Sequence, residues 1–167
     1  LIENGKVLMD YAKIHPFSYG EESKYFQGGS EVCVASLQGI KMGGFVCYDL
    51  RFPEIFQLSS DYSELIVVIA NWPAARINHW DVLLQARAIE NQCYIAGVNR
   101  TGEGGGLIYN GHSAVYGPEG DRLTDVSEEE ELLIVDIDSA KVRDYRESFP
   151  AKKDRQRDLY LQLYQGF

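Results

Sequence analysis

Cysteine, histidine and long apolar runs are all scarce in this sequence, and each shortage excludes a class of protein. The 167 residues contain three cysteines, at positions 33, 47 and 93, with no CxxC spacing, so a disulfide-rich secreted scaffold is excluded and a reducing cytoplasm is the expected location. The three histidines show no HxxH or HExxH spacing, and neither a metal ion nor another cofactor is expected. No apolar run reaches the roughly 18 residues of a membrane-spanning helix, so we expect no membrane insertion.

Positive charge is also in short supply. Lysine and arginine number 16 against 25 aspartates and glutamates, which gives a net charge of −9. Nucleic acids and anionic membrane surfaces both require clustered Lys and Arg, so neither is an expected partner. With 45% hydrophobic and 25% charged residues, the composition is ordinary for a globular protein, and we expect residues 1–167 to form one domain.

Strand and helix patterns alternate along the chain, and tight turns such as 38–39 join several strands. The predicted strands cover residues 6–13, 31–37, 40–46, 64–70, 93–99, 113–116 and 131–138, and the predicted helices cover 54–60, 75–92 and 139–145. A mixed sheet follows from this order, so the predicted class is α/β with sheet layers under helices. The glycine-rich stretch 101–106 does not fit GxGxxG and precedes no clear helix, so we interpret it as a flexible rim loop rather than a phosphate loop.

The stretch that organises the chain is 43–54, GGFVCYDLRFPE. Residues 40–46 alternate as a strand, and Pro53 fits the first turn of a following helix, so Cys47 lies where a strand stops and the chain turns sharply. A side chain at such a bend points readily into a cleft. Cys47 is therefore either a small buried hydrophobic residue or a nucleophile, and its place ahead of the charged cluster of Asp49, Arg51 and Glu54 keeps both alternatives open. If Cys47 is the nucleophile, Arg51 and Glu54 are expected to support its site.

A charged pair lies within the strongest predicted helix. Arg87 and Glu90 fall on or beside the apolar stripe of residues 75–92. Two interpretations remain open: a boundary salt bridge, worth at most about 1 kcal/mol if exposed, or a second layer of side chains that positions active-site groups.

Several motifs in sequence order resemble the carbon–nitrogen hydrolase (nitrilase) superfamily, and most closely its omega-amidase-like and related aliphatic amidase branches. They are YAKIHPF, CYDLRFPE, NWP, ARAIENQ, NR and the C-terminal FPAKKDRQRDLY. The resemblance implies an α-β-β-α sandwich of the nitrilase type and subunits that pair into a homodimer or larger homo-oligomer. It also implies a cysteine hydrolase whose substrate is a small amide or nitrile.

The resemblance assigns roles to individual residues. Cys47 is the expected nucleophile, Lys13 within KIHPF the catalytic lysine, and Glu22 within ESKYFQGG a second active-site glutamate. The alternative for Lys13 is a strand-edge lysine whose ammonium reaches water. His15 is expected to be a structural hydrogen bonder rather than a base.

The implied reaction requires a thiolate, because an unperturbed cysteine is only about 3% ionised at pH 7. The Lys13 ammonium is expected to lower the pKa of Cys47. Lys13 and the backbone amide of Tyr48 are the expected donors to the tetrahedral oxyanion, and such a donor lowers the barrier by about 3–4 kcal/mol. A thioester then forms and water hydrolyses it.

Nitrilase-like domains carry their principal glutamate base in a segment ahead of the KIHPF strand. We therefore expect this chain to correspond to the C-terminal two-thirds of such a domain, and expect residues 1–167 alone to be inactive and poorly soluble. The alternatives are a binding or scaffold subunit with the same fold, a nitrile hydrolase, and an enzyme that passes the acyl group to an amine. The sequence does not identify the acyl group.

Overall fold

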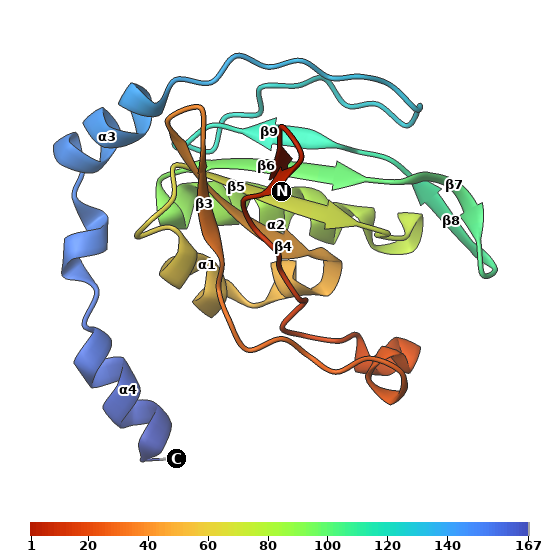
Figure 1. The fold of residues 1–167 in the computed structure, drawn as a ribbon, viewed down its shortest axis with the longest axis horizontal. Helices are drawn as coiled ribbons and strands as arrows, with labels where there is room; N and C mark the ends of the chain where they lie inside the picture. Colours follow the sequence, from red (N-terminus) through yellow and green to blue (C-terminus); the bar gives the residue numbers. More distant parts are fainter. Residues whose placement is uncertain (167) are drawn as a thin grey trace.

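The computed structural model describes residues 1–166, and its centre is a five-stranded mixed sheet (Figure 1). The strand order is β3-β4-β5-β6-β9; the three central strands run parallel and both edge strands are antiparallel to their neighbours. The bounds are Val34–Leu37 (β3), Ile40–Val46 (β4), Leu65–Ala70 (β5), Tyr94–Asn99 (β6) and Ala114–Tyr116 (β9). The predicted mixed α/β class is confirmed.

A two-residue turn joins β3 to the strand that precedes Cys47. Leu37 pairs with Ile40, and the intervening Gln38 and Gly39 have φ of +50° and +85°. Two consecutive positive φ values define the turn whose twist matches that of a hairpin. This predicted turn is confirmed, and it fixes which face of β4 each side chain occupies.

Two helices cover one face of the sheet: α1 (Pro53–Ser59) and α2 (Ile77–Asn91). Phe56 and Trp80, both fully buried, come from these helices and pack with the inward-facing Ile66, Val68 and Ile95 of the sheet. A Cβ at Gly97 of β6 would lie within 2.4 Å of Leu84 of α2, so the missing side chain lets the helix approach the sheet closely.

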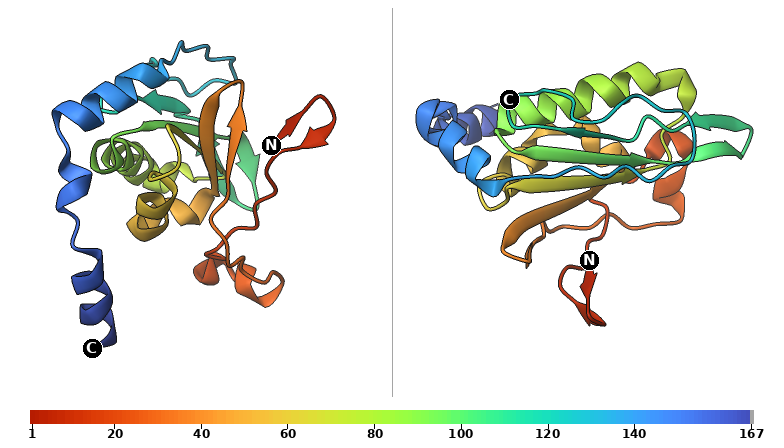
Figure 2. Two further views of the ribbon diagram at one scale, coloured as in Figure 1. Left: turned by 60° about the vertical axis from the view of Figure 1, so that its left-hand side comes forward. Right: turned by 90° about the horizontal axis from the view of Figure 1, so that it is seen from above.

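The opposite face is only partly covered. Leu65, Tyr94 and Val142 form a small buried cluster under helix α3 (Ser139–Ser148), whereas Ile69 and Val98 are 53% and 52% exposed. The N-terminal hairpin of β1 (Ile2–Glu3) and β2 (Lys6–Val7) lies on the side of the sheet away from α2 (Figure 2). Within residues 1–166, no helix is long and apolar enough to cross a membrane.

Three predicted elements differ from the structure. Only Lys6–Val7 of the strand expected over 6–13 is a strand, because the residues after it bond to side chains and a loop instead of a neighbouring strand. The strand expected over 131–138 has no ladder partner in the described part of the chain, and Leu132 and Ile134 are both 83% exposed. The expected rim loop is a hairpin of β7 (Thr101–Gly104) and β8 (Leu107–Asn110).

Short 3-10 helices fill several connections. They are Ser18–Gly20 (η1), Glu22–Lys24 (η2), Cys47–Arg51 (η3), Ala74–Arg76 (η4) and Ala151–Asp154 (η5). The predicted helices at 54–60, 75–92 and 139–145 are confirmed with boundary shifts of one to three residues. Pro53 is the first residue of α1, as its missing amide hydrogen predicts.

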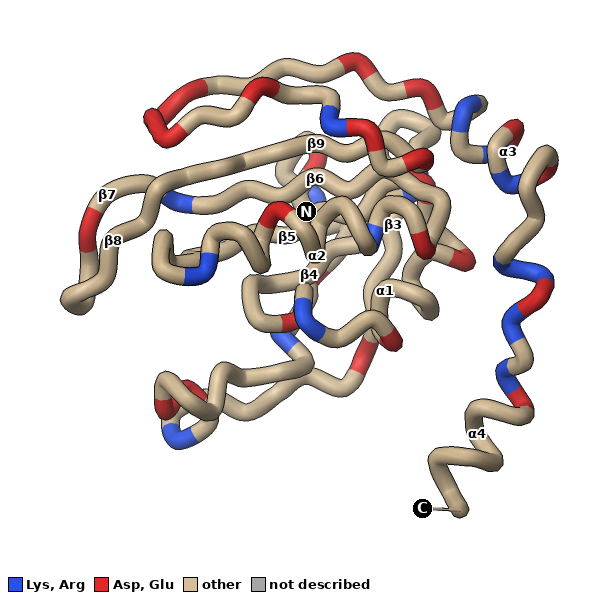
Figure 3. The backbone as a smooth tube through the Cα atoms, turned by 180° about the vertical axis from the view of Figure 1, so that it is seen from behind, with Lys and Arg blue, Asp and Glu red and all other residues tan. Residues whose placement is uncertain are grey.

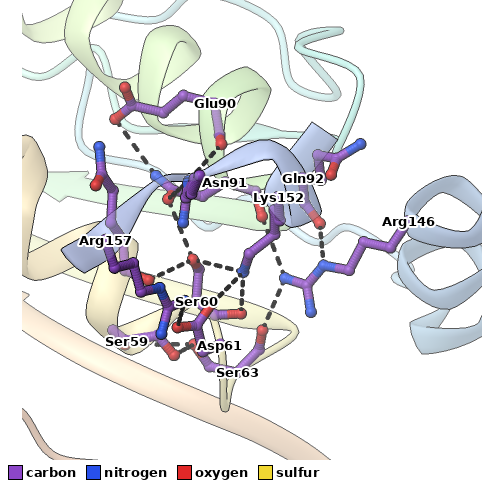
Figure 4. Close-up of polar contacts among 12 residues, drawn as sticks. Ser59, Ser60, Asp61, Ser63, Glu90, Asn91, Gln92, Arg146, Lys152 and Arg157 are labelled. Carbon is purple, nitrogen blue, oxygen red and sulfur yellow. Dashed lines mark hydrogen bonds and ion pairs between the residues drawn. The ribbon is translucent and has the colours of Figure 1, made fainter. Parts of the chain in front are cut away.

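From the last turn of α3 onward the chain crosses the C-terminal ends of α1 and α2, and we call residues 146–157 the basic strap (Figure 4). Lys152 Nζ donates to the carbonyl of Ser60 at 2.8 Å, and Arg146 Nε donates to that of Gln92 at 3.0 Å. Arg155 Nη2 donates to the carbonyl of Glu90 at 2.8 Å. These carbonyls belong to the unpaired ends of the two helices, where positive charge is also favourable.

The strap is the densest run of Lys and Arg along the backbone (Figure 3). Lys152 and Arg157 both pair with Asp61, which gives the strap an acidic anchor in the turn after α1. Beyond the strap, helix α4 (Arg157–Gln165) projects from the body of the molecule (Figure 1), and its Leu161 and Tyr164 are 60% and 72% exposed.

Candidate active site

Cys47 occupies the turn between β4 and α1. The strand ends at Val46, and Cys47 opens the 3-10 helix η3 with a φ of +49°. Positive φ is uncommon for any residue other than glycine and is found preferentially at functional sites, because the surrounding structure must hold it in place. The predicted strand end and sharp turn at Cys47 are therefore confirmed.

Lys13 and Glu22 meet in front of this turn. Lys13 Nζ lies 2.5 Å from Glu22 Oε2, and the same oxygen accepts a hydrogen bond of 2.6 Å from the backbone amide of Phe17. The lysine side chain is only 14% exposed and the glutamate side chain 32%. The alternative of a lysine that reaches water is thus excluded by the geometry: Lys13 is turned inward and paired.

Two cavities meet at Cys47. The first, of about 540 Å³, is lined by Lys13, Phe17, Glu22, Val46, Cys47, Ile69, Ala70, Asn71, Val98, Asn99 and Arg100. The second, of about 230 Å³, is lined by Phe17, Gly20, Cys47, Tyr48, Arg51, Asn71, Trp72, Pro73, Arg76, Leu107 and Tyr109. A larger cavity of about 710 Å³ lies against α3, and none of the predicted site residues lines it. The two cavities at Cys47 are therefore the candidate active site because of the reactive side chains that line them, not because of their volume.

The environment of Cys47 raises the pKa of its thiol. Burial raises it most, and the nearby Glu22 carboxylate acts in the same direction. The Lys13 charge lowers the pKa, as do contacts with the Asn71 carbonyl and the Tyr48 backbone. The expected influence of Lys13 is present, but the expected net lowering of the pKa is wrong, because burial outweighs the Lys13 charge.

Glu22 behaves in the opposite way. Burial raises the pKa of its carboxyl, but hydrogen bonds from Lys13 and from the amide of Phe17, together with the Lys13 charge, bring the pKa below its ordinary value. Glu22 is consequently ionised at neutral pH. The site therefore pairs a protonated thiol with a carboxylate–ammonium pair, which is an arrangement for moving a proton when a substrate carbonyl arrives.

The structure divides the predicted supporting residues. Arg87 is 4% exposed and donates to the carbonyl of Leu50 through Nε at 3.1 Å and Nη2 at 2.7 Å, so it holds the turn that carries Cys47. Glu90 reaches this turn only through Arg87, at 3.0 Å from its Nη1. The pair thus forms a salt bridge, and Arg87 also contacts the turn that carries Cys47.

Arg51 and Glu54 lie on different sides of the turn. Arg51 lines the smaller cavity, with its guanidinium 4.8 Å from the centroid of the Trp72 ring. Glu54 is exposed in the first turn of α1 and lines neither cavity. The structure brings Arg51 to the candidate site and leaves Glu54 outside it.

The sequence interpretation assigned no site role to three polar residues. Asn71 and Asn99 line the 540 Å³ cavity, and Asn99 Oδ1 accepts a hydrogen bond from the amide of Trp72 at 2.7 Å. Asp49, within the CYDLR motif, is fully buried. Its place in the charged cluster after Cys47 was the available signal in the sequence, whereas its burial, which is rare for an acid unless it is paired, appears only in the structure. His15 bonds to Asp49 through Nδ1 at 2.9 Å, so the predicted structural role of His15 is confirmed.

Comparison with known proteins gives consistent matches over nearly the whole chain. A family model described as carbon-nitrogen hydrolase matches residues 1–147. The 2-oxoglutaramate amidase of Bacillus subtilis (strain 168) is 38% identical over 159 residues, which cover 95% of this chain and 61% of that protein. Omega-amidase YafV of Escherichia coli (strain K12) is 40% identical over 156 residues, which cover 92% of this chain and 60% of that protein.

A solved structure matches the fold equally well. A mutant of the amidase from Nesterenkonia sp. AN1 has a TM-score of 0.83 and 31% identity, covering 95% of this chain and 58% of that chain. That structure shows the acetamide moiety of fluoroacetamide added covalently at its active-site cysteine. The chain spans about three-fifths of the length of the relatives that it matches.

Proposed function

The chain belongs to the carbon–nitrogen hydrolase family, and from that premise we propose that the protein hydrolyses a small aliphatic amide to a carboxylic acid and ammonia. The family and the nitrilase-type fold predicted from the sequence are confirmed. The observation that carries the proposal is the position of Cys47 on a positive-φ turn where two cavities meet, with the inward-turned Lys13 lining one of them. The amidase names of the relatives support the amide over the nitrile.

In the proposed reaction, Cys47 Sγ attacks the amide carbon and the carbonyl π electrons move onto oxygen. Because the pKa of this thiol is raised, its proton must pass to a general base as the sulfur–carbon bond forms. The Lys13 ammonium and the Tyr48 amide stabilise the oxyanion, and each such donor lowers the barrier by about 3–4 kcal/mol. The amide nitrogen takes a proton and leaves as ammonia, and water then hydrolyses the thioester, restoring the thiol.

The supporting residues have distinct parts in this proposal. The ionised Glu22 bonds to Lys13 Nζ and holds the lysine side chain at the wall of the cavity. Arg87 stabilises the turn of Cys47 through the carbonyl of Leu50. Arg51 contributes to the wall of the smaller cavity, where part of the acyl group lies.

The test is ammonia release from small aliphatic amides, combined with mass spectrometry of the acylated protein. We expect an acyl adduct on Cys47, and none after Cys47→Ala. Cys33→Ala is the matched control, because Cys33 lines neither cavity at the site and its loss leaves the reaction intact. The assay compares residues 1–167 with the reading frame extended upstream of Leu1. An adduct on Cys33 or Cys93, or consumption of nitriles but not amides, contradicts the proposal.

A further inference from the structure

Asp49 is a fully buried carboxylate whose two oxygens together accept hydrogen bonds from two segments of the chain. No Lys or Arg pairs with it among the described residues; the one basic side chain within salt-bridge distance there is His15. Burying a carboxylate in this way is costly unless every lone pair finds a donor. The hydrogen bonds that satisfy the Asp49 carboxylate therefore also fix the positions of the groups that donate them.

We propose that Asp49 is a positioning residue that sets Lys13 against Cys47, an inference that rests on the proposed amide hydrolysis. On one side it fixes the segment that bears the lysine. Tyr11 Oη donates to Asp49 Oδ2 at 2.8 Å, and the backbone amide of His15 donates to Oδ1 at 3.0 Å. Lys13 lies midway between these two anchors.

A third bond tightens the same segment. The hydroxyl of Tyr11 accepts a hydrogen bond of 3.2 Å from the backbone amide of Ile14, so one hydroxyl links Asp49 to the residue directly after Lys13. Burial, and then the hydrogen bond and charge of Asp49, raise the pKa of Tyr11 above its usual range. Tyr11 therefore remains a donor at every pH in which the enzyme is expected to work.

On the other side, Asp49 fixes the nucleophile turn. Asp49 Oδ2 accepts a hydrogen bond of 3.1 Å from the amide of Val46, the residue directly before Cys47, and Asp49 itself belongs to the 3-10 helix that Cys47 opens. The bond therefore closes the turn around the positive φ of Cys47. One side chain thus holds both the lysine segment and the strained nucleophile.

Two roles for Asp49 predict opposite shifts of the Cys47 pKa. If the carboxylate acted only as a nearby negative charge, Asp49→Asn would lower the pKa of Cys47, because a like charge would be gone. If Asp49 positions Lys13, the asparagine side chain of the variant places its N–H donors against groups that are themselves donors, namely the hydroxyl of Tyr11 and the amides of His15 and Val46. The segment that bears Lys13 then loosens, and the pKa of Cys47 rises.

The experiment is alkylation of Cys47 by iodoacetamide as a function of pH, followed by mass spectrometry of the Cys47 peptide, with the Cys33 peptide as an internal reference. For Asp49→Asn we expect the apparent pKa of Cys47 to rise by about one unit, which slows alkylation at pH 7 about tenfold. In the Lys13→Met background, Asp49→Asn should produce no further shift, because the two residues act through one interaction.

A fall or no change in the pKa for Asp49→Asn, or an equal shift without Lys13, overturns the inference. Tyr11→Phe removes the two hydrogen bonds of that hydroxyl but leaves the bonds of Asp49 to His15 and Val46, so it should raise the pKa of Cys47 by a smaller amount. It serves if Asp49→Asn does not fold. Ser60→Ala, at a buried hydroxyl under the basic strap, is the matched control and should leave the pKa unchanged. Alkylation needs no turnover, so a protein that fails to release ammonia but shows these shifts contradicts the proposed function alone.

Discussion

Replacing Gly43 by alanine should destabilise the protein through a clash that the structure locates to one atom. A Cβ at Gly43 would lie 2.2 Å from Ser59 Oγ and 3.5 Å from both Ile66 and Ser63. Contacts under 3.0 Å essentially never occur, so at least 0.8 Å (3.0 − 2.2) must be absorbed by β4 or by α1. Ser59 is fully buried, and its hydroxyl lies 3.3 Å from that of Ser63, so the side chain has little freedom to yield.

Overpacking of this kind costs about 1–3 kcal/mol. For a protein of this size, each kcal/mol lowers the Tm by about 2–4 °C. Urea denaturation gives the free energy of unfolding, and Gly104→Ala is the matched control. There the nearest atoms belong to the flexible guanidinium of Arg100 at 3.2 Å, so a change within about 0.5 kcal/mol is expected.

Ser59→Ala supplies the decisive comparison. Alone it should cost about 1 kcal/mol through the lost hydrogen bond between the Ser59 and Ser63 hydroxyls. Combined with Gly43→Ala, it removes the clashing oxygen, so the double variant should be more stable than the sum of the single changes by about 1 kcal/mol. If Gly43→Ala costs no more than Gly104→Ala, or if the two costs simply add, the reasoning about close approach at β4 is refuted.

Further substitutions test the candidate active site and the structure that supports it. Glu22→Gln removes a negative charge near Cys47, so alkylation of Cys47 should become faster at neutral pH while amide turnover falls; equal or slower alkylation would contradict the assigned charge effect. Burial and Arg146 lower the pKa of Lys152 to about 8 in the folded protein. Between pH 8 and about 10.5, Lys152 is therefore protonated in the unfolded state and largely neutral in the folded state, so the free energy of unfolding rises with pH across that window. Urea melts should show a shallower rise for Lys152→Gln, and an unchanged slope would contradict the shift. Asn99→Ala leaves the buried amide of Trp72 without its acceptor and should cost about 2–4 kcal/mol, measured by the same melts, whereas a cost below about 0.5 kcal/mol would show that water replaces the bond.

The central strands were predictable because the hydrophobic pattern of each one can be recognised without knowing which strands lie beside it. Residues 65–70 form a continuous apolar run, which predicts a central strand even though Ile69 is 53% exposed on the partly covered face, and residues 40–46 alternate up to Cys47. The segments that were predicted wrongly lie at the margins. Whether residues 8–13 or 131–138 pair as strands depends on which partner reaches them, and their own apolar periodicity contains no information on this.

The hairpin at 101–110 carried a local signal that a composition-based reading passed over. Gly105 and Gly106 have φ of +59° and +76°, so they form a two-residue turn that only flexible residues adopt readily. The number of glycines in this stretch suggested a loop, whereas the position of Gly105 and Gly106 between two short extended segments indicated a hairpin. Considering where the glycines lie, as well as how many there are, would have predicted the hairpin.

The candidate site was only partly accessible from sequence. Lys13 and Glu22 came from motif resemblance, and their ion pair spans a loop whose path no periodicity describes. The charged cluster after Cys47 included Asp49, but its structural role was out of reach because that role depends on burial and on donors 34 and 38 positions away in the sequence. Local patterns identify elements, whereas a buried polar network appears only when the elements have been assembled.

The basic strap also has a consequence for folding during synthesis, because it leaves the ribosome after the helices that it contacts. Lys152 follows its carbonyl partner Ser60 by 92 residues, and Arg146 follows Ser63 by 83. At a synthesis rate of about 5–20 residues per second, the end of α1 waits roughly 4–18 seconds for the side chains that close it. The end of α2, whose partners Arg146 and Arg155 follow by 54 and 65 residues, waits roughly 3–13 seconds. During that interval the nascent domain presents open helix ends to chaperones and proteases. A chain stalled before Arg146 is the form that cellular quality control should recognise first.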